Sequence, residues 1–380
     1  MTRHNIPLGK ILGIQIGLDY SWFVIFALLT WTLADSYYPD EFKNWSPLTY
    51  WLTGAATAIM LFVSVLLHEL GHSVIALRYK ITVRSITLFL FGGVAEIAAE
   101  PPGAAAELLV AIGGPIVSLL LAVFFYAAQS AVSGVEPLLG LAKYLAYINT
   151  ALVLFNLIPG YPLDGGRVFR SIVWAITGSM SRATIIAANV GRLFAFVLIF
   201  TGTFQMFSGN LGGGLWIALI GWFLDSAASV QLQQVVLRGL LMGHRVAQAM
   251  NTHCAIVPET VTLQRLVDEQ ILGSGQRCFL VNRGDQTLGM ITLHRVKGIP
   301  REKWITMNVA DVMLPFEQLK CTNPDTDLWS ALQNIDRAGV NQMPVVQAHR
   351  VVGMLSREDA ITFLRSIQEL GISTSTKPGA

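Results

Sequence analysis

Charged residues are scarce in this chain of 380 residues. Asp, Glu, Lys and Arg make up 13% of it, against about 25% in soluble globular domains. The shortage is concentrated before about Val236, where long apolar runs follow one another, while the residues after it have the composition of a soluble domain. The scarcity excludes a protein that lies wholly in water and predicts a membrane part followed by a soluble part.

Cysteines and net charge are also low. The three cysteines, Cys254, Cys278 and Cys321, form no C-x-x-C pair, which argues against a cysteine metal site and fits a reduced compartment. The net charge of +2, with no basic stretch interleaved with aromatics, argues against nucleic acid as a partner. The N-terminus lacks a signal-peptide pattern, so the first apolar segment is expected to stay on the protein.

The apolar runs predict about six transmembrane helices. Each run has about the 20 residues that a bilayer crossing needs. The candidates are Ile14–Ala34, Tyr50–Ala76, Ala104–Ala131, Leu138–Pro159, Ala183–Phe207 and Leu211–Val230. Lys and Arg gather in the connections on one side, which places the N- and C-termini in the cytoplasm.

The second candidate contains His68-Glu69-Leu70-Gly71-His72. Two His at positions i and i+4 face the same side of a helix and can bind Zn²⁺, and the Glu between them is placed to act on a water molecule. Ionisable groups inside a membrane span are costly unless they have a function. Hydrogen-bonded packing is the alternative for a lone His, but the pair with Glu69 favours metal-assisted hydrolysis.

The end of the fourth candidate carries a third metal-binding side chain. Pro159 and Pro162 prevent a regular helix there, so Asp164 arrives at the depth of the two His in a segment free to turn inward. His68, His72 and Asp164 would fill three tetrahedral positions and leave the fourth open. The alternative for Asp164 is a turn residue, because Asp-Gly is a common turn pair. Asn156 could orient a ligand or stabilise an oxyanion, and a helix-packing contact is an equal alternative.

These motifs resemble the site-2 proteases, which are intramembrane zinc metalloproteases. The resemblance rests on H-E-x-x-H in one span and N-x-x-P-x-x-x-L-D-G at a later one, and it covers roughly residues 10–235. It implies one Zn²⁺ per chain held by His68, His72 and Asp164, with Glu69 as the catalytic acid and base. It also implies a single-span membrane protein as substrate, of the anti-sigma-factor or tethered transcription factor type.

The segment Arg84–Ile97 is too short to cross the membrane as a helix. Ile86–Phe91 is expected to form a strand, Gly92-Gly93 a turn, and Val94–Ile97 a returning strand. Members of the resembled family carry a comparable membrane-associated hairpin. Phe91, Gly92 and Gly93 are therefore predicted to bind substrate by strand addition. A hairpin that only plugs the helix bundle is the alternative.

The last part of the chain contains an internal repeat. Val246-Ala247-Gln248-Ala249-Met250 recurs as Val309-Ala310-Asp311-Val312-Met313, and Gly289-Met290-Ile291-Thr292 recurs as Gly353-Met354-Leu355-Ser356. The repeat resembles a tandem pair of CBS domains, which pack together and often bind adenine nucleotides. The resemblance assigns nucleotide contacts to Ser356, Asp359 and Thr292, although Arg295 stands where the first copy would need its Asp. A rigid scaffold or homodimer contact is the alternative role.

The sequence thus predicts an α-helical polytopic membrane protein with about six transmembrane helices, one membrane-associated β-hairpin and a cytoplasmic α+β tandem CBS module. Expected domains are residues 1–236, 245–300 and 307–370. The expected function is intramembrane zinc proteolysis gated by ATP, ADP or AMP, in a bacterial inner membrane or a plastid membrane. A CBS-regulated divalent-metal transporter or channel is the rival, and the spacing of Glu69 between the two His argues against it.

Overall fold

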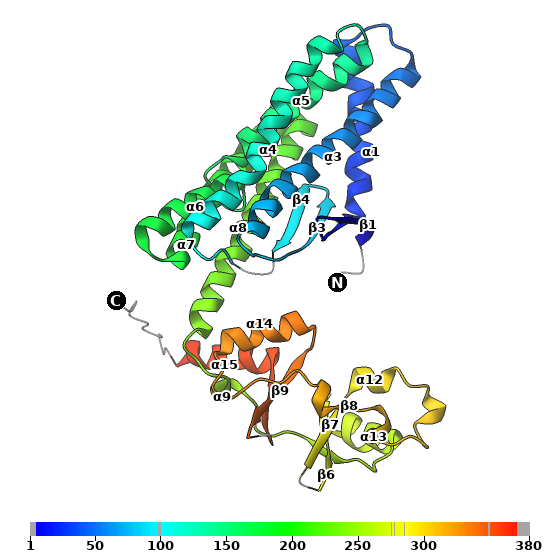
Figure 1. Ribbon diagram of the computed structural model, residues 1–380, viewed down its shortest axis with the longest axis vertical. Helices are drawn as coiled ribbons and strands as arrows, with labels where there is room; N and C mark the ends of the chain where they lie inside the picture. The colour runs from blue at the N-terminus through cyan, green and yellow to red at the C-terminus, as the bar shows by residue number, and fades with distance from the viewer. Residues whose placement is uncertain are drawn as a thin grey trace. The chain divides into compact units, whose positions relative to one another are not determined.

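The computed structural model describes residues 5–97, 100–274, 276, 278–284, 286–348 and 350–370. The chain divides into two compact units, Met1–Val235 and Val236–Ala380, whose elements are labelled in Figure 1. Residues 1–4, 98, 99, 275, 277, 285 and 349 belong to the predicted domains but lie outside the described residues.

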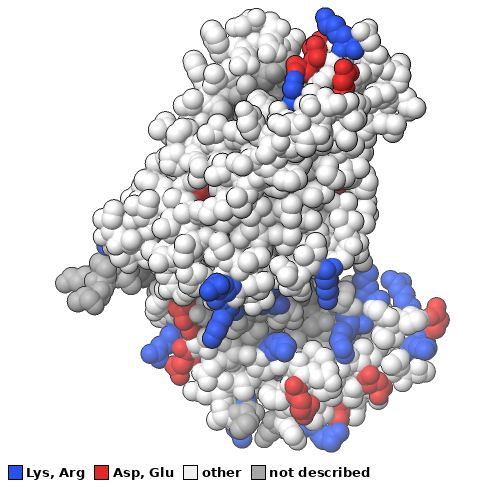
Figure 2. All heavy atoms as spheres, turned by 45° about the horizontal axis from the view of Figure 1, so that its top comes forward, with Lys and Arg blue, Asp and Glu red and all other residues white. Residues whose placement is uncertain are grey.

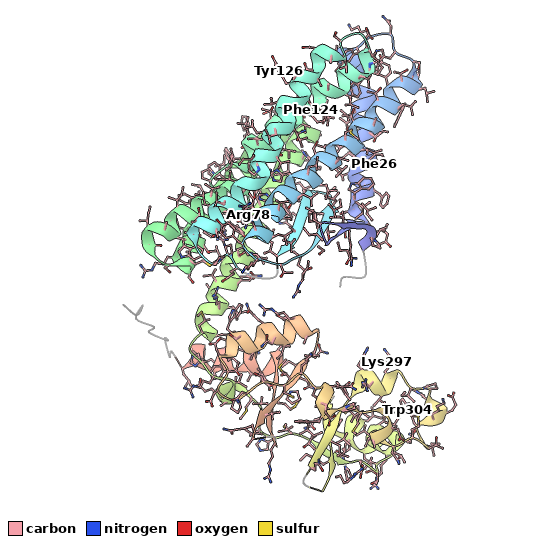
Figure 3. All side chains as sticks on the ribbon, viewed as in Figure 1. Phe26, Arg78, Phe124, Tyr126, Lys297 and Trp304 are labelled. Carbon is pink, nitrogen blue, oxygen red and sulfur yellow. The ribbon has the colours of Figure 1, made fainter. Side chains whose placement is uncertain are left out.

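Five described helices are long and apolar enough to cross a membrane: α3 (Pro47–Arg78), α4 (Ala104–Ala131), α5 (Glu136–Asn156), α7 (Met180–Phe207) and α8 (Leu211–Leu241). Their outer faces are apolar. Phe124 and Tyr126 lie on the outside of α4 (Figure 3) and are 62% and 73% exposed. Figure 2 shows a broad face of the helical unit that carries almost no charged side chains. Such a surface is stable in lipid and is unfavourable in water.

The first predicted span is wrong in its boundaries. Ile14–Asp19 is strand β2, and helix α1 begins only at Ser21. α1 (Ser21–Thr32) has 12 residues and continues through a π-helical turn (Leu33–Tyr37) into α2 (Tyr38–Glu41). Residues 14–19 form a strand because their apolar side chains alternate, which lets Ile14, Ile16 and Leu18 all be buried against neighbouring elements. The number of membrane crossings stays a prediction.

The predicted hairpin is part of a four-stranded sheet. β3 (Val83–Phe89) pairs antiparallel with β4 (Gly92–Ile97), and β2 pairs parallel with β3. β1 (Asn5–Ile11) completes the order β1-β2-β3-β4, so β4 is an edge strand. The turn consists of Leu90 and Phe91 rather than Gly92-Gly93, and Gly92 begins the returning strand with a φ of 133° that favours glycine.

The two prolines after α5 end that helix as predicted. α5 stops at Asn156, and residues 157–163 form no regular helix. Helix α6 (Asp164–Thr177), which the sequence did not predict, begins at Asp164 and packs against α4 and α7.

The second unit contains two similar halves. The first half has a four-stranded sheet of β5 (Ile256–Pro258), β6 (Cys278–Arg283), β7 (Gln286–Thr292) and β8 (Leu314–Pro315). Its helical segments are α10 (Leu263–Arg265), a π-helical turn (Leu266–Ile271), α11 (Leu272–Ser274) and, directly after β7, α12 (Leu293–Lys297). Two short 3-10 helices, Arg301–Lys303 and Phe316–Gln318, also belong to this part. The second half has α14 (Leu328–Ala338), β9 (Gln342–Gln347), β10 (Arg350–Ser356) and α15 (Arg357–Glu369).

The two halves exchange their first helices. α9 (Val246–Ala249) precedes the first half in sequence, but Val246 and Ala249 lie in the core of the second half with Leu328 and Leu355. α13 (Val309–Val312) does the reverse and packs with Val257, Phe279 and Ile291. Each core therefore depends on the other half of the repeat.

Candidate metal centre

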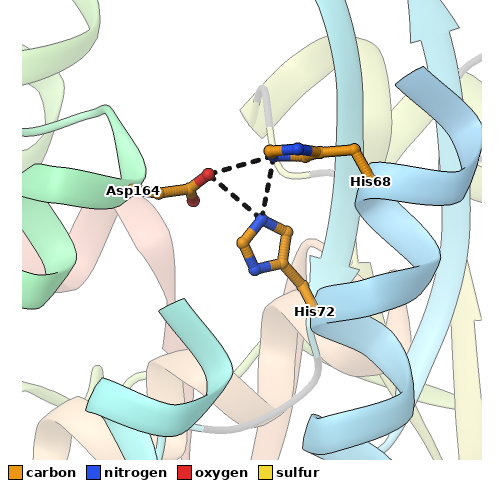
Figure 4. A group of neighbouring side chains, drawn as sticks. All are labelled: His68, His72 and Asp164. Atoms are coloured by element: carbon orange, nitrogen blue, oxygen red, sulfur yellow. Dashed lines mark hydrogen bonds and ion pairs between the residues drawn. The ribbon is translucent and has the colours of Figure 1, made fainter. Parts of the chain in front are cut away.

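The two histidines of the H-E-x-x-H motif project from one face of α3. His68 and His72 are 5% and 4% exposed, and their Nε2 atoms are 3.2 Å apart. Figure 4 shows both imidazoles directed at the same point. The spacing of four residues brings them together, because a helix turns once in 3.6 residues.

Asp164 reaches the same point from the first residue of α6 (Figure 4). Its Oδ2 atom lies 3.0 Å from His68 Nε2 and 3.2 Å from His72 Nε2. Ligand atoms around a tetrahedral ion with bonds of about 2.0 Å are about 3.3 Å apart. The three atoms therefore form one face of a coordination tetrahedron whose size fits Zn²⁺.

Helix α4 orients both imidazoles. Ser118 Oγ lies 2.8 Å from His68 Nδ1, and the Val110 carbonyl oxygen accepts a hydrogen bond of 2.7 Å from His72 Nδ1. With the proton on Nδ1, each Nε2 keeps its lone pair for a metal. The roles of Ser118 and Val110 in orienting the imidazoles were not predicted from the sequence. The only signal for Ser118 was a polar residue inside an apolar run, and a backbone carbonyl leaves no signal at all.

Gly114 of α4 leaves the space that an ion requires. A Cβ atom at this position would lie 2.2 Å from His72 Nε2 and 2.5 Å from His68 Nε2. α3 and α4 approach closely just beside it, since a Cβ on Gly71 would lie 2.6 Å from the Gly113 carbonyl oxygen. The residues present therefore fit a metal ion on the face that the two Nε2 atoms share.

The Glu69 side chain lies beside this centre and under the β-hairpin. A Cβ atom on Gly93 would come within 2.6 Å of Glu69 Cγ and 3.2 Å of its Oε1 atom. Glu69 is half-buried, and no donor pairs with its carboxylate among the residues that the structure describes. It is therefore available to exchange protons with a reacting group.

Phe91 at the tip of the hairpin is covered by helix α8. Its ring stacks on Phe223 with a centroid distance of 4.4 Å and lies 6.4 Å from the Trp216 ring. Phe91 is half-buried in this aromatic contact, whereas Gly93 faces Glu69. The structure thus places the predicted substrate-binding segment next to the motif. Phe91 of this segment contacts α8, and Gly93 contacts Glu69 of the motif.

The structure does not bring Asn156 into hydrogen-bond contact with the three ligand side chains. It is the last residue of α5 and is half-buried. Asn149, two turns earlier, is fully buried and donates to the Leu145 carbonyl oxygen at 2.8 Å and to Ser64 Oγ at 3.3 Å. Ser64 lies one turn before His68 on α3, so Asn149 ties α5 to the motif helix.

In the second unit, Ser356 stands at the N-cap of the last helix, α15, and its Oγ atom accepts a hydrogen bond from the Asp359 backbone N–H at 3.1 Å. Asp359 Oδ2 in turn accepts hydrogen bonds from the Ser356 backbone N–H at 2.8 Å and from Ser356 Oγ at 2.6 Å. Thr292 occupies the equivalent N-cap of α12. Arg295 instead donates to the carbonyl oxygens of Val312 and Met313 at 2.8 and 3.0 Å. The two predicted nucleotide sites therefore differ in charge and in hydrogen bonding.

The three cysteines lie outside the cluster of His68, His72 and Asp164. All three are free, and burial raises the pKa of the Cys278 thiol to about 12. The thiol form is therefore favoured there at neutral pH in the absence of a bound ion.

Comparison with known proteins connects the chain to metalloproteases. The model of the family described as Peptidase family M50 matches residues 56–143 and 129–198, and the CBS domain model matches residues 309–366. The chain is 35% identical over 362 residues to zinc metalloprotease Rip3 of Mycobacterium tuberculosis, covering 94% of this chain and 92% of that protein. It is 34% identical over 367 residues to zinc metalloprotease sll0528 of Synechocystis, covering 96% of each.

Among solved structures, the site-2 protease from Methanocaldococcus jannaschii matches 60% of this chain and 95% of its own. The sequence identity in that match is 28% and the TM-score is 0.43.

Proposed function

Because this chain belongs to the site-2 proteases, the zinc metalloproteases of Peptidase family M50, we propose that it cleaves membrane-anchored regulatory proteins within or near their transmembrane segment. The observation that supports the site is the convergence of His68, His72 and Asp164 on one point with tetrahedral spacing. One Zn²⁺ per chain is held by these three side chains.

The chemistry of the centre divides between metal and protein. Zinc bound by these three side chains would act as a Lewis acid, polarising the scissile carbonyl and making water easier to deprotonate. Glu69 accepts a proton from the attacking water and donates it to the leaving amine. Ser118 and Val110 hold the two imidazoles in the tautomer that directs Nε2 at the metal. Asn156 is assigned to oxyanion stabilisation as a prediction only.

The substrate is held as a strand on the free edge of β4. A helical substrate hides its peptide bonds in its own hydrogen bonds, and pairing with an edge strand keeps it unwound. Support comes from the position of β4 at the edge of its sheet and from the contact of Gly93 with Glu69. Phe91, Gly92 and Gly93 thereby place the scissile bond beside the acid and base.

The C-terminal part, residues 245–300 and 307–370, acts as a regulatory CBS pair and as a homodimer contact. Adenine nucleotide binds at Ser356 and Asp359 and, in the first copy, at Thr292. Asp359 already accepts two hydrogen bonds from Ser356, so a ribose would compete with the helix cap. Helix α8 contains both Phe223, which stacks on Phe91, and Leu241, which lies in the core of the second unit. The polypeptide between these two residues could therefore transmit a change in the CBS pair to the hairpin.

Nucleotide gating predicts that ATP, ADP or AMP changes the cleavage rate of the purified full chain at millimolar concentration. Ser356→Ala removes one hydroxyl contact and is expected to weaken that response. Ser366→Ala, a change on the following helix α15 and outside the proposed contacts, serves as the control. Rates that stay constant with all three nucleotides would refute the gating and leave the protease assignment intact.

The membrane-embedded unit places the protein in a membrane as a multi-pass protein, and we assign it to a bacterial inner membrane or a plastid membrane with both termini in the cytoplasm. The regulatory module then lies in the compartment that contains free adenine nucleotides.

The proposed activity is tested by co-expressing the chain with candidate single-span proteins of the anti-sigma-factor type. A soluble fragment should appear with the wild-type chain and disappear when zinc is chelated. Divalent-ion flux into vesicles without any fragment would instead support the rival transporter.

A further inference from the structure

A buried ion pair joins α4 to α6 close to the metal centre. Glu107 on α4 is 0% exposed and Arg170 on α6 is 7% exposed. Arg170 donates to Glu107 Oε1 through Nε at 2.7 Å and through Nη2 as well, and Arg167 Nε lies 4.0 Å from the same oxygen. Glu107 Oε2 has no hydrogen-bond partner in the described part of the chain.

Such a pair is expensive in a membrane-embedded unit. The desolvation cost of two charges can exceed their mutual attraction, so a buried ion pair is weak evidence for stability. A pair that fixes a particular geometry is the hypothesis that follows for Glu107 and Arg170.

The pair connects the helix that orients the imidazoles with the helix that carries the third ligand. Glu107, Gly114 and Ser118 are spaced along one face of α4, and the last two contact His68. Asp164 is the first residue of α6, six residues before Arg170, which is about 9 Å along a helix axis. α6 is thus held to the neighbouring helices at two separate positions: Asp164 contacts the two histidines of α3, and Arg170 contacts Glu107 of α4.

The first turn of α6 also packs closely against the loop that precedes it. Cβ atoms on Gly165 and Gly166 would lie within 2.3 Å of the Leu157 backbone and 2.2 Å of the Gly160 backbone. These contacts seat the helix start on the preceding loop, but they involve neither α3 nor α4. Among the contacts described, the Glu107 carboxylate is the charged group that holds α6 to α4.

We propose that the Glu107–Arg170 ion pair is a positioning device that sets the rotation of α6 and thereby holds the Asp164 carboxylate in ligand distance of His68 and His72. The proposal rests on the proposed zinc centre. Neither residue is a catalytic residue, since both act through Asp164. Loss of the pair should loosen one of three ligands and leave the two imidazoles as they are.

The test measures zinc affinity of the purified full chain by competition with a chromogenic chelator. Glu107→Gln keeps the shape of the side chain and removes its charge, and it should weaken zinc binding by about 10–100-fold, the range seen when groups that support a ligand are removed. Glu107→Leu combined with Arg170→Met removes both charges of the pair together, so neither partner stays buried without the other if Glu107→Gln fails to fold. Arg167 keeps its charge, but its side chain is 16% exposed. This double variant should fold and show the same loss of affinity.

Two controls separate positioning from general stability. Asp225→Asn breaks the Arg192–Asp225 pair between α7 and α8, which is 2.9 Å long and contacts none of the three ligands, and it should leave zinc affinity unchanged. In an Asp164→Ala background, Glu107→Gln should lower zinc affinity by less than about twofold, because the ligand it positions is already gone.

The results distinguish the proposal from the assignment on which it rests. Wild-type zinc affinity in a folded double variant, or a full additional loss in the Asp164→Ala background, would overturn the positioning role while the zinc centre stands. A wild-type chain that binds no zinc would overturn both.

Discussion

Glu69→Gln is expected to leave zinc bound and to lower the rate of peptide cleavage by about 10²–10⁴-fold, the contribution typical of general acid and base catalysis. The substitution keeps the size of the side chain and removes the group that exchanges protons. Zinc should stay because Glu69 is not one of the three side chains whose ligand atoms converge. The measurement compares zinc content and cleavage rate of the purified variant and the wild type in the same lipid.

Glu41→Gln is the matched control for this variant. Glu41 is the last residue of α2, outside the proposed substrate-binding strand, and it pairs with Lys143 at 2.7 Å on the exposed surface. Its loss should leave the cleavage rate within about twofold, since an exposed ion pair contributes little. Cleavage at the wild-type rate by Glu69→Gln would remove Glu69 from the mechanism, and loss of zinc from that variant would make it a ligand.

Asp164→Asn is expected to weaken zinc binding by more than about 10²-fold and to abolish cleavage with it. An amide is a poorer zinc ligand than a carboxylate, and the loss of a direct ligand should exceed the 10–100-fold effect of removing a supporting group. Asn also keeps the size of the side chain at the first position of α6. Chelator competition measures the affinity.

Thermal unfolding of the metal-free protein is the control for Asp164→Asn. The metal-free wild type and variant should unfold within a few degrees of one another, whereas added zinc should stabilise only the wild type, in proportion to its affinity. A variant that still binds zinc as tightly as the wild type would show that Asp164 is a helix-terminal residue and that another side chain completes the centre.

The sequence was sufficient to predict the convergence of His68, His72 and Asp164. The two His are neighbours on any helix, and the two prolines before Asp164 place it at the depth where an apolar span ends. Both signals are local in the chain. The structure brings the three side chains together as that reasoning expected, and the similarity to zinc metalloproteases agrees with the chemistry inferred from them.

The features that escaped prediction depend on contacts between distant segments. β2 looked like the start of a span because Ile14, Ile16 and Leu18 are apolar, and its pairing with β1 and β3 makes it a strand. Val110 orients His72 through a backbone carbonyl, which no residue type encodes. The exchange of α9 and α13 between the two repeat cores is equally invisible in the repeat itself, because both copies have the same pattern wherever they pack.

The centre is tested most directly by zinc X-ray absorption of the purified wild-type chain reconstituted in lipid. The spectrum should show one zinc per chain with two imidazole nitrogens and one carboxylate oxygen at about 2.0–2.2 Å in a four-coordinate site. Sulfur at about 2.3 Å, or a spectrum that is identical in the Asp164→Asn variant, would contradict a catalytic zinc held by His68, His72 and Asp164.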